Sequence, residues 1–416
     1  MTGSENARGR KRFLSPRYLA GKVREKGAVW CFKSAVSKLF RLIYRPVKRS
    51  AGFLIWVFPV LGKLLSTTRP DERRLLAIYD LSCQPFSIGD ILVIQEASLV
   101  LLEKHHLDMV DFAIVYDPKH PVSSDPAFAS ITEENAMYHL ASILPVAQVN
   151  QHLGSLFVFN SHSHLERFIA DNGDRYQVWP TAWQFAKRKY LYYTVFNDLL
   201  YNYYREHGSI PHLLCRQFLI DWAQAFYREH VYPQAPVTVQ VRNNNAFHTH
   251  RNLNLECWVE FFHHCEERYP VKFVVICALG EVDDRLRQCF NVVIAKDYHT
   301  NIEQDLTLIH MAAIHMGASS GPGTMAVFNT KPHFLVAKRF GAAALEPHSY
   351  RGMIQEGNFL RFCFAGPLQR FTVGPETTEL LVAEFARMWE TVDVENWKSL
   401  ATTEDKPASE IPMWLR

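Results

Sequence analysis

Residues 302–337 place the strongest constraint on the fold, because they read as helix, strand, turn, helix and strand in direct succession. At the start of this stretch, apolar residues recur at i, i+4, i+7 and i+11, which is one face of a helix. The apolar runs 314–318 and 333–337 predict two strands, and the small residues between them predict a turn and a short helix. Two strands joined by a helical crossover are typical of a parallel α/β sheet.

The turn that begins at Ser319 follows the carboxyl end of the first of these strands, where open α/β sheets bind their ligands. Outward-facing amides and the start of the next helix suit a phosphate group, because both favour negative charge. The hydroxyls of Ser320 and Thr324 would add donors. Gly321 would allow a backbone geometry or a ligand approach that a Cβ obstructs. The alternative is an ordinary tight turn whose small residues meet only steric needs.

Strand and helix patterns alternate along most of the chain, in two halves. The first half has strand patterns at 75–79, 112–116, 156–159 and 176–179, with helical patterns at 91–105 and 133–144. The second half has strand patterns at 237–241, 273–277 and 292–295, a helical pattern from Leu255, and then the stretch 302–337. Two amphipathic helices, 182–205 and 212–230, connect the halves. This alternation predicts an α/β protein with two Rossmann-like parallel sheets.

The predicted domain organisation follows from these patterns. The parts are a basic arm over 1–70, a Rossmann-like acceptor domain over 71–182, a helical bridge over 183–232, a Rossmann-like nucleotide-sugar domain over 233–345, loops and a returning helix over 346–400 with the helix at 378–389, and a flexible tail over 401–416. The eight cysteines include no CxxC pair and several lie in apolar runs, which favours reduced core thiols and a cytoplasmic compartment.

The first 70 residues differ sharply in charge from the rest of the chain. They hold sixteen Lys and Arg against two Glu, a net of +14, while the remainder holds 29 basic and 40 acidic residues, a net of −11. Residues 28–49 have a basic amphipathic pattern, and the aromatic, apolar stretch 52–62 contains Pro59 and is too short to span a bilayer. The combination predicts a peripheral arm on the anionic, cytoplasmic face of a membrane. A nucleic-acid-binding arm and a helix packed on the protein itself are the alternatives.

Three motifs, in order, resemble those of a known family. They are Ile88-Gly89-Asp90 after the first strand, Arg242 through Arg251-Asn252 after the first strand of the second half, and Gly317 through Pro322 followed by Lys331-Pro332. Together with the two halves, they resemble the GT-B-fold bacterial glycosyltransferase-like family, with heptosyltransferases and O-fucosyltransferases as relatives, over about residues 75–390. The His-x-Arg signature of the O-fucosyltransferases is replaced here by Gln240-Val241-Arg242.

The resemblance implies two Rossmann-like domains that face a cleft and an enzyme of polysaccharide biosynthesis. It would move a sugar from a nucleotide-sugar donor to a glycan or lipid-linked acceptor, with Gly89 on the acceptor side. A departing nucleoside diphosphate needs positive charge and N–H donors. Arg242, Arg251 and the loop from Ser319 to Thr324 would supply them. Surface salt bridges are the alternative role for both arginines.

The transfer also needs a base for the acceptor hydroxyl. The resemblance assigns this role to Asp90, for which a helix N-cap is the structural alternative. His248 and His250, in the polar loop after residue 241, are further candidates.

We expect no cofactor and no metal ion. The pairs His248/His250 and His263/His264 lack Cys or acidic ligands at a recognisable spacing, and the nucleotide-sugar itself is the substrate. No nucleic acid partner is expected. A sugar-nucleotide epimerase and a non-catalytic, membrane-bound nucleotide-sugar-binding module are the alternative functions.

Overall fold

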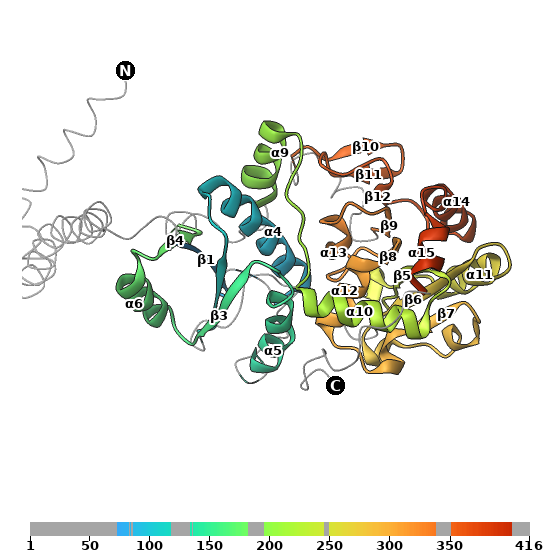
Figure 1. Cartoon of the computed structure of the whole chain (residues 1–416), viewed down its shortest axis with the longest axis horizontal. Helices are drawn as coiled ribbons and strands as arrows, with labels where there is room; N and C mark the ends of the chain where they lie inside the picture. Colours follow the sequence, from blue (N-terminus) through green and yellow to red (C-terminus); the bar gives the residue numbers. More distant parts are fainter. Residues whose placement is uncertain are drawn as a thin grey trace, which may run out of the picture. The chain divides into compact units, whose positions relative to one another are not determined.

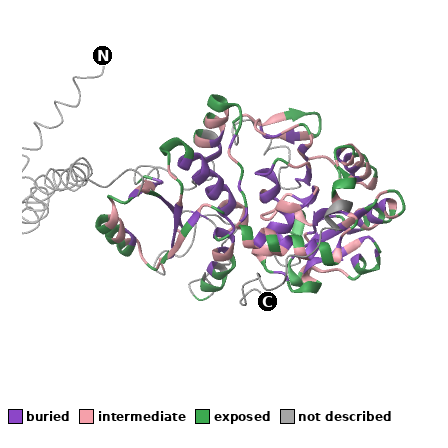
Figure 2. Cartoon of the chain, in the orientation of Figure 1, coloured by how far each residue is buried: buried purple, intermediate pink, exposed green. Residues whose placement is uncertain are grey.

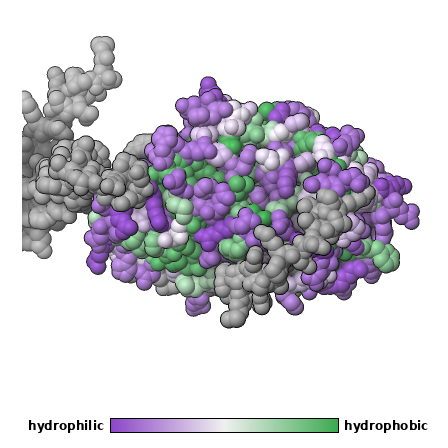
Figure 3. Space-filling model, in the orientation of Figure 1, coloured by the Kyte–Doolittle hydropathy of each residue, from purple (hydrophilic) through white to green (hydrophobic). Residues whose placement is uncertain are grey.

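The computed structural model (Figure 1) describes residues 73–117 apart from 83 and 85, residues 134 and 136–181, and residues 195–244, 249–337 and 351–401. All of these belong to one compact unit, Arg69–Arg416. The predicted arm over 1–70, the candidate residue His248 and nearly all of the predicted tail lie outside the described residues. Among the described helices, none has the length and apolar character needed to cross a bilayer. The face of this unit seen in Figure 3 is mainly hydrophilic, with scattered hydrophobic patches.

The first sheet contains four parallel strands in the order β3-β2-β1-β4. The strands are β1 (Arg74–Asp80), β2 (Val110–Val115), β3 (Leu153–Phe159) and β4 (Tyr176–Trp179), and the helices are α4 (Ile88–His105), α5 (Ala136–Ala147) and α6 (His162–Asn172). Alternate residues of a strand face opposite sides of its sheet. Leu75 and Tyr79 therefore join the core that contains α4, whereas Leu76 and Ile78 join a smaller core with α6.

The second sheet contains eight strands in the order β10-β11-β12-β9-β8-β5-β6-β7. Its parallel centre consists of β5 (Ala235–Gln240), β6 (Val271–Ile276), β7 (Val292–Ile294), β8 (Ile314–Ala318) and β9 (His333–Val336). The helices here are α11 (Leu255–Glu266), α12 (Ile302–Met311) and the single turn α13 (Thr324–Val327), and the 3-10 turns are η4 (Thr249–Arg251), η5 (Leu279–Glu281), η6 (Leu286–Gln288) and η7 (Ala295–Tyr298). In each sheet the first strand of the half lies between the second and the fourth, which is the Rossmann order. The prediction of two Rossmann-like parallel sheets is confirmed.

The C-terminal segment differs from its prediction of loops and one helix. It adds three strands to the second sheet, β10 (Ile354–Glu356), β11 (Phe359–Arg361) and β12 (Gln369–Thr372), followed by α14 (Thr378–Trp389) and α15 (Val394–Ala401). These strands have three or four residues each, too few to produce a recognisable apolar alternation. α14 has the predicted bounds, and it packs on α11, with the rings of Phe385 and Phe261 at 5.5 Å, rather than returning to the first sheet.

The connection between the halves is also less helical than predicted. It contains the π-helical turn η3 (Val195–Leu200), α9 (Tyr201–His207) and α10 (Gln217–His230), with residues 182–194 outside the described part. α10 begins at Gln217 instead of 212 because the preceding residues pair with the first half. Cys215 forms a β-bridge with Asn150, and the N–H of Arg216 donates to Val149 O at 3.0 Å.

One hydrophobic core extends through both halves. It includes residues of α4, α5, α10, α12 and α13, and the hydroxyl of Tyr227 in α10 donates to Leu308 O in α12 at 2.6 Å. Figure 2 shows the buried residues gathered in the strands and on the inner faces of these helices. The six described cysteines are free thiols and four of them are buried, which agrees with the prediction of reduced core residues.

Candidate functional site

The loop between β8 and α13 has the predicted position, but most of its amides bond within the protein. The N–H groups of Ser319, Ser320 and Thr324 donate to backbone carbonyls at 3.0, 2.9 and 3.1 Å. The N–H of Gly323 donates to Gln240 Oε1 at 3.0 Å. The prediction of an outward-facing amide cradle is wrong at these four positions because pairing with β9, closing the turn and the bond to Gln240 use the donors. α13 is a single turn, so the start of that helix adds little. Any anion at this loop must therefore be bound mainly by side chains.

Gln240, the last residue of β5, holds this loop in place. Its buried side chain donates from Nε2 to Ser320 Oγ and accepts from the N–H of Gly323. These two bonds offset the cost of burying the amide. β8 can lie this close to β5 because residue 317 is a glycine. A Cβ at Gly317 would lie 2.3 Å from Gln240 O, and its φ of +130° is one that other residues rarely adopt. This role of Gln240 is not visible in the sequence, because alternation within β5 does not show which side chain reaches the loop of a neighbouring strand.

Arg242 and Arg251 lie at the same edge of the sheet. Arg242 lies two residues after the end of β5 and is half-buried, and its carbonyl accepts from Leu253 N–H at 3.1 Å. Arg251 ends η4 and donates from Nη2 to Ser319 O at 2.8 Å. The structure therefore brings Arg251 onto the β8–α13 loop. Its role in binding phosphate stays a prediction.

The segment between these arginines is closed by two asparagines. Asn244 N–H donates to Asn252 Oδ1 at 3.0 Å, and Asn252 Nδ2 donates to Asn244 O at 2.9 Å. His250 lies exposed in η4. His248 lies within the closed segment but outside the described residues, so its catalytic role stays a prediction.

The start of α4 contacts the β8–α13 loop. A Cβ on Gly321 would lie 2.9 Å from Ile88 Cβ and 3.2 Å from Gly89 N, and a Cβ on Gly89 would lie 3.0 Å from Thr324 Oγ1. The φ of Gly321 is not among the positive values, so this glycine meets a need for space between the two halves and not for left-handed backbone. The contact also shows that the carboxyl edges of the two sheets face each other, because α4 begins at one edge and the loop lies at the other.

Asp90 lies in the first turn of α4 and is not its cap. Ser87 is the N-cap, and its Oγ accepts from the N–H of Asp90 at 3.5 Å. The cap alternative for Asp90 is wrong because the helix begins at Ile88, three residues earlier than predicted. The half-buried carboxylate of Asp90 lies near the positive end of the helix dipole. Its catalytic role stays a prediction.

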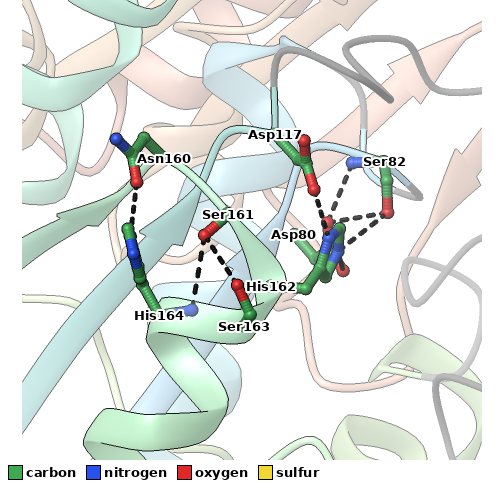
Figure 4. Close-up of polar contacts among 8 residues, drawn as sticks. All are labelled: Asp80, Ser82, Asp117, Asn160, Ser161, His162, Ser163 and His164. Carbon is green, nitrogen blue, oxygen red and sulfur yellow. Dashed lines mark hydrogen bonds and ion pairs between the residues drawn. The ribbon is translucent and has the colours of Figure 1, made fainter.

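A second cluster, not predicted from the sequence, lies at the carboxyl edge of the first sheet (Figure 4). His162 Nε2 lies 2.8 Å from Asp80 Oδ2, and His162 Nδ1 lies 3.1 Å from Asp117 Oδ2. Ser82 donates to Asp80 Oδ1 from its N–H at 2.9 Å and from its hydroxyl at 2.8 Å. The same hydroxyl oxygen is 3.4 Å from His162 Nε2. We call these four residues the histidine cluster.

Local structure fixes His162 in this cluster. Ser161 caps α6 by accepting from the N–H of His164 at 3.3 Å, so His162 is the first residue of the helix. Asp80 ends β1, and Asp117 follows β2 by two residues. A signal was present in the sequence, since each of the three ionisable residues follows a strand whose carboxyl end meets the same edge. The sequence alone did not reveal that these strands are neighbours.

The charge of His162 is set by its two carboxylate partners. Burial lowers the pKa of His162, but the hydrogen bonds and charges of Asp80 and then Asp117 outweigh it, so that the pKa lies above its ordinary value. Among the described residues, no group of three or more His, Cys, Asp or Glu is placed to hold a metal ion. The two carboxylates of the histidine cluster thus favour the protonated form of His162.

No model of a protein family matches the sequence, and no curated protein matches it. The chain is similar to a glycosyl transferase family 9 structure from Veillonella parvula, with 11% identity, 78% of this chain and 99% of that chain covered, and a TM-score of 0.47. It is similar to the ADP-heptose LPS heptosyltransferase II of E. coli, with 10% identity, 76% and 98% coverage and a TM-score of 0.43. It is also similar to the fucosyltransferase NodZ from Bradyrhizobium, with 12% identity, 63% and 94% coverage and a TM-score of 0.27. These likenesses are low in sequence identity, and what is said of each residue rests on the geometry described above.

Proposed function

We propose that the protein transfers a sugar from a nucleotide-sugar donor to a glycan or lipid-linked acceptor. The observation that carries the proposal is the position of Arg251, whose guanidinium donates to Ser319 O at 2.8 Å at the carboxyl edge of the second sheet. Open α/β sheets bind their ligands at this edge. Arg242 follows the adjacent strand β5, so two cationic side chains belong to the same ligand-binding edge.

The chemistry of the transfer explains why charge is needed there. When the bond from C1 of the sugar to the diphosphate oxygen breaks, its electron pair stays on the diphosphate. A guanidinium remains charged at any working pH and matches the geometry of phosphate oxygens. The hydroxyls of Ser320 and Thr324 border the same loop. In this proposal the arginines supply the charge that a divalent cation supplies in metal-dependent transferases.

The first experiment tests donor binding and turnover separately. A thermal-shift panel of UDP-, GDP-, ADP- and CMP-sugars should contain one compound that raises the melting temperature by linkage. With that donor carrying a radiolabelled sugar, a membrane lipid extract should acquire label as free nucleotide is released. Conversion of the donor sugar without release of nucleotide would indicate an epimerase. Binding without turnover would indicate a binding module, and no binding would contradict the proposal.

We further propose that residues 1–70 hold the reaction at an anionic membrane surface. The support is their net charge of +14 combined with the aromatic stretch 52–62. Full-length protein should sediment with anionic liposomes and much less with neutral ones. Changing Lys33, Lys38, Arg41 and Arg45 to Gln should weaken this binding more than 10-fold, at about 1 kcal/mol per charge. Equal sedimentation of the variant and the wild type would contradict the proposal.

A further inference from the structure

The buried amide of Gln240 lies between two partners of different kinds. The N–H of Gly323 donates to one end of the amide at 3.0 Å, and the hydroxyl of Ser320 contacts the other end. A backbone N–H can only donate, so the amide oxygen must face Gly323. The NH2 group of the amide must then face Ser320. The orientation of the Gln240 side chain is therefore fixed by the backbone of the loop that it holds.

This orientation decides what the hydroxyl of Ser320 can do. A hydroxyl group has a single proton to donate, and its oxygen can accept. The oxygen of Ser320 accepts from Gln240 Nε2, so the hydroxyl proton is not directed at Gln240. In the part of the chain that the structure describes, the Ser320 side chain makes no other hydrogen bond. Ser320 is half-buried, so its proton remains available to a molecule bound at the loop.

The surroundings of Ser320 favour an anion as that molecule. Its own N–H and those of Ser319, Gly323 and Thr324 donate within the protein, so the main chain offers no donor at these positions. Arg251 donates from Nη2 to the carbonyl of Ser319, the preceding residue, at 2.8 Å. A guanidinium group and an outward hydroxyl proton therefore belong to the same short stretch of the carboxyl edge. Both groups stabilise phosphate oxygens.

We propose that Ser320 donates its hydroxyl proton to the diphosphate of the nucleotide-sugar and that Gln240 is the positioning residue that directs this proton; the inference rests on the proposed function. In this arrangement Gln240 does not touch the nucleotide. It keeps Ser320 Oγ as an acceptor, so that the hydroxyl proton points out of the protein. When the bond from C1 of the sugar to the diphosphate breaks, the hydrogen bond from Ser320 becomes stronger because negative charge collects on the leaving group.

Removal of the hydroxyl tests its contact with the nucleotide. The probe is UDP, GDP or ADP, whichever gives the largest thermal shift with wild type, and its affinity is measured by calorimetric titration. Ser320→Ala should weaken binding by about 10- to 100-fold, the effect of one hydrogen bond to a charged group. Affinity for the matching nucleoside, which has no phosphate, should not change. Equal affinity of wild type and Ser320→Ala for the nucleotide would overturn the proposal.

Gln240→Glu tests the orientation of the hydroxyl. A carboxylate can still accept from the N–H of Gly323, but it has no proton to donate to Ser320. The Ser320 hydroxyl should then donate to this carboxylate, and nucleotide affinity should fall at least as far as in Ser320→Ala.

The decisive comparison keeps the new carboxylate in place, because its charge would also repel the nucleotide. In the Gln240→Glu background, adding Ser320→Ala should weaken binding by at most about 2-fold, since the hydroxyl proton no longer reaches the nucleotide. A residue that only stabilises the loop would leave the effect of Ser320→Ala unchanged. The same large loss in both backgrounds would therefore overturn the role given to Gln240.

Gln369→Glu is the matched control for the same chemical change elsewhere in the second sheet. Gln369, in β12, is also buried, accepts from the N–H of Gly366 at 2.7 Å and donates to Lys331 O at 3.1 Å. A carboxylate that faces a carbonyl oxygen should destabilise the fold, but nucleotide affinity should stay near wild type. A loss of affinity equal to that of Gln240→Glu would show that destabilisation alone explains the effect, and it would overturn the proposal.

The outcomes keep the two proposals apart. If wild type binds none of UDP, GDP and ADP, the proposed function falls together with the inference. If wild type binds one of them, wild-type affinity in Ser320→Ala or equal losses in the two backgrounds overturn only the inference. If Gln240→Glu does not fold, Ser320→Ala decides, because it leaves the main-chain hydrogen bonds of the loop unchanged.

Discussion

The carboxyl edges of the two sheets have the same topology and opposite chemistry. In each half the first strand lies between the second and the fourth. At the first edge the strands are followed by Asp80, Asp117 and His162, which bind one another. At the second edge, Gln240 holds the β8–α13 loop and Arg251 donates to it. One edge is thus anionic and binds protons, and the other offers cationic and hydroxyl groups.

This difference shows how one fold can hold two halves of a reaction. The Rossmann order brings the strand ends together, but it does not decide which side chains follow each strand. An acidic edge suits an acceptor hydroxyl that must lose a proton. An edge with arginines suits a diphosphate that gains negative charge. Substitutions at the first edge should therefore leave nucleotide binding at the second edge intact, and substitutions at the second edge should leave proton binding at the first intact.

The largest effect is expected from the arginines of the second edge. A charge-assisted hydrogen bond contributes about 1.5–3 kcal/mol. Arg242→Ala and Arg251→Ala should therefore each weaken binding of the nucleoside diphosphate by about 10- to 100-fold, measured by calorimetric titration. Asp117→Asn, at the first edge, should leave this affinity near wild type.

A matched control removes a surface arginine. Arg285 is exposed and paired with Asp283 at 2.9 Å, so Arg285→Ala should bind the nucleotide as wild type does. Wild-type affinity in Arg242→Ala and Arg251→Ala would contradict the proposed contrast between the edges, because the second edge would then bind the nucleotide without these charges.

The next effect concerns the contact between the edges. Gly321→Ala places a Cβ 2.9 Å from Ile88 Cβ, so the start of α4 must shift. Overpacking of this kind costs about 1–3 kcal/mol, which denaturant unfolding would detect. The control is Gly280→Ala, where a Cβ meets nothing within 4 Å and the change should stay within about 0.5 kcal/mol. If both variants were equally stable, the close approach of the two edges at Gly321 would be in doubt.

A smaller effect follows from the opposite behaviour of the histidines in the two sheets. The pKa of His162 is raised, so its contribution to stability is present below the unfolded pKa of about 6.5 and is lost as pH rises through the folded value. Burial, and then the charge of His333, lowers the pKa of His315 to about 3, and burial lowers that of His333 to about 4. Their contributions are present above pH ~6.5 and are lost as pH falls from there toward the folded pKa values of about 4 for His333 and about 3 for His315.

Unfolding free energies measured from acid to alkaline pH test this contrast. The stability difference between wild type and His162→Gln should shrink as pH rises, and it should stay below about 1 kcal/mol because the imidazole is half-exposed. The same comparison made in an Asp117→Asn background should depend less on pH. A difference that grows with pH would contradict the described surroundings of His162.

The smallest expected effect is that of removing metal ions. Because the arginines are proposed to supply the charge at the second edge, EDTA should leave turnover and nucleotide affinity unchanged. Loss of activity in EDTA, restored by a divalent cation, would show that the edge needs a bound metal in addition to its arginines.

The sequence predicted regular structure best where local signals agreed. α14 has the predicted bounds because Thr377 caps it by accepting from the N–H of Leu380 and because its apolar positions repeat with helical spacing. The strands β10, β11 and β12 were missed, since three or four residues at a sheet edge carry little pattern. The predicted start of α10 was too early. The residues before it pair with the first half through Cys215 and Asn150, and a contact between such distant segments leaves no local pattern in the sequence.

By itself, the sequence determined the alternation of strands and helices and the position of the β8–α13 loop. Each of these depends on neighbouring residues, whose spacing selects helix or strand directly. The tertiary structure alone decided that Gly89 contacts the loop at Gly321 and that Gln240 accepts a hydrogen bond from the N–H of Gly323 in that loop. It also decided that His162 lies between two carboxylates, 82 and 45 residues earlier in the chain. Such encounters depend on which strands become neighbours, and that order is set by packing of the whole core.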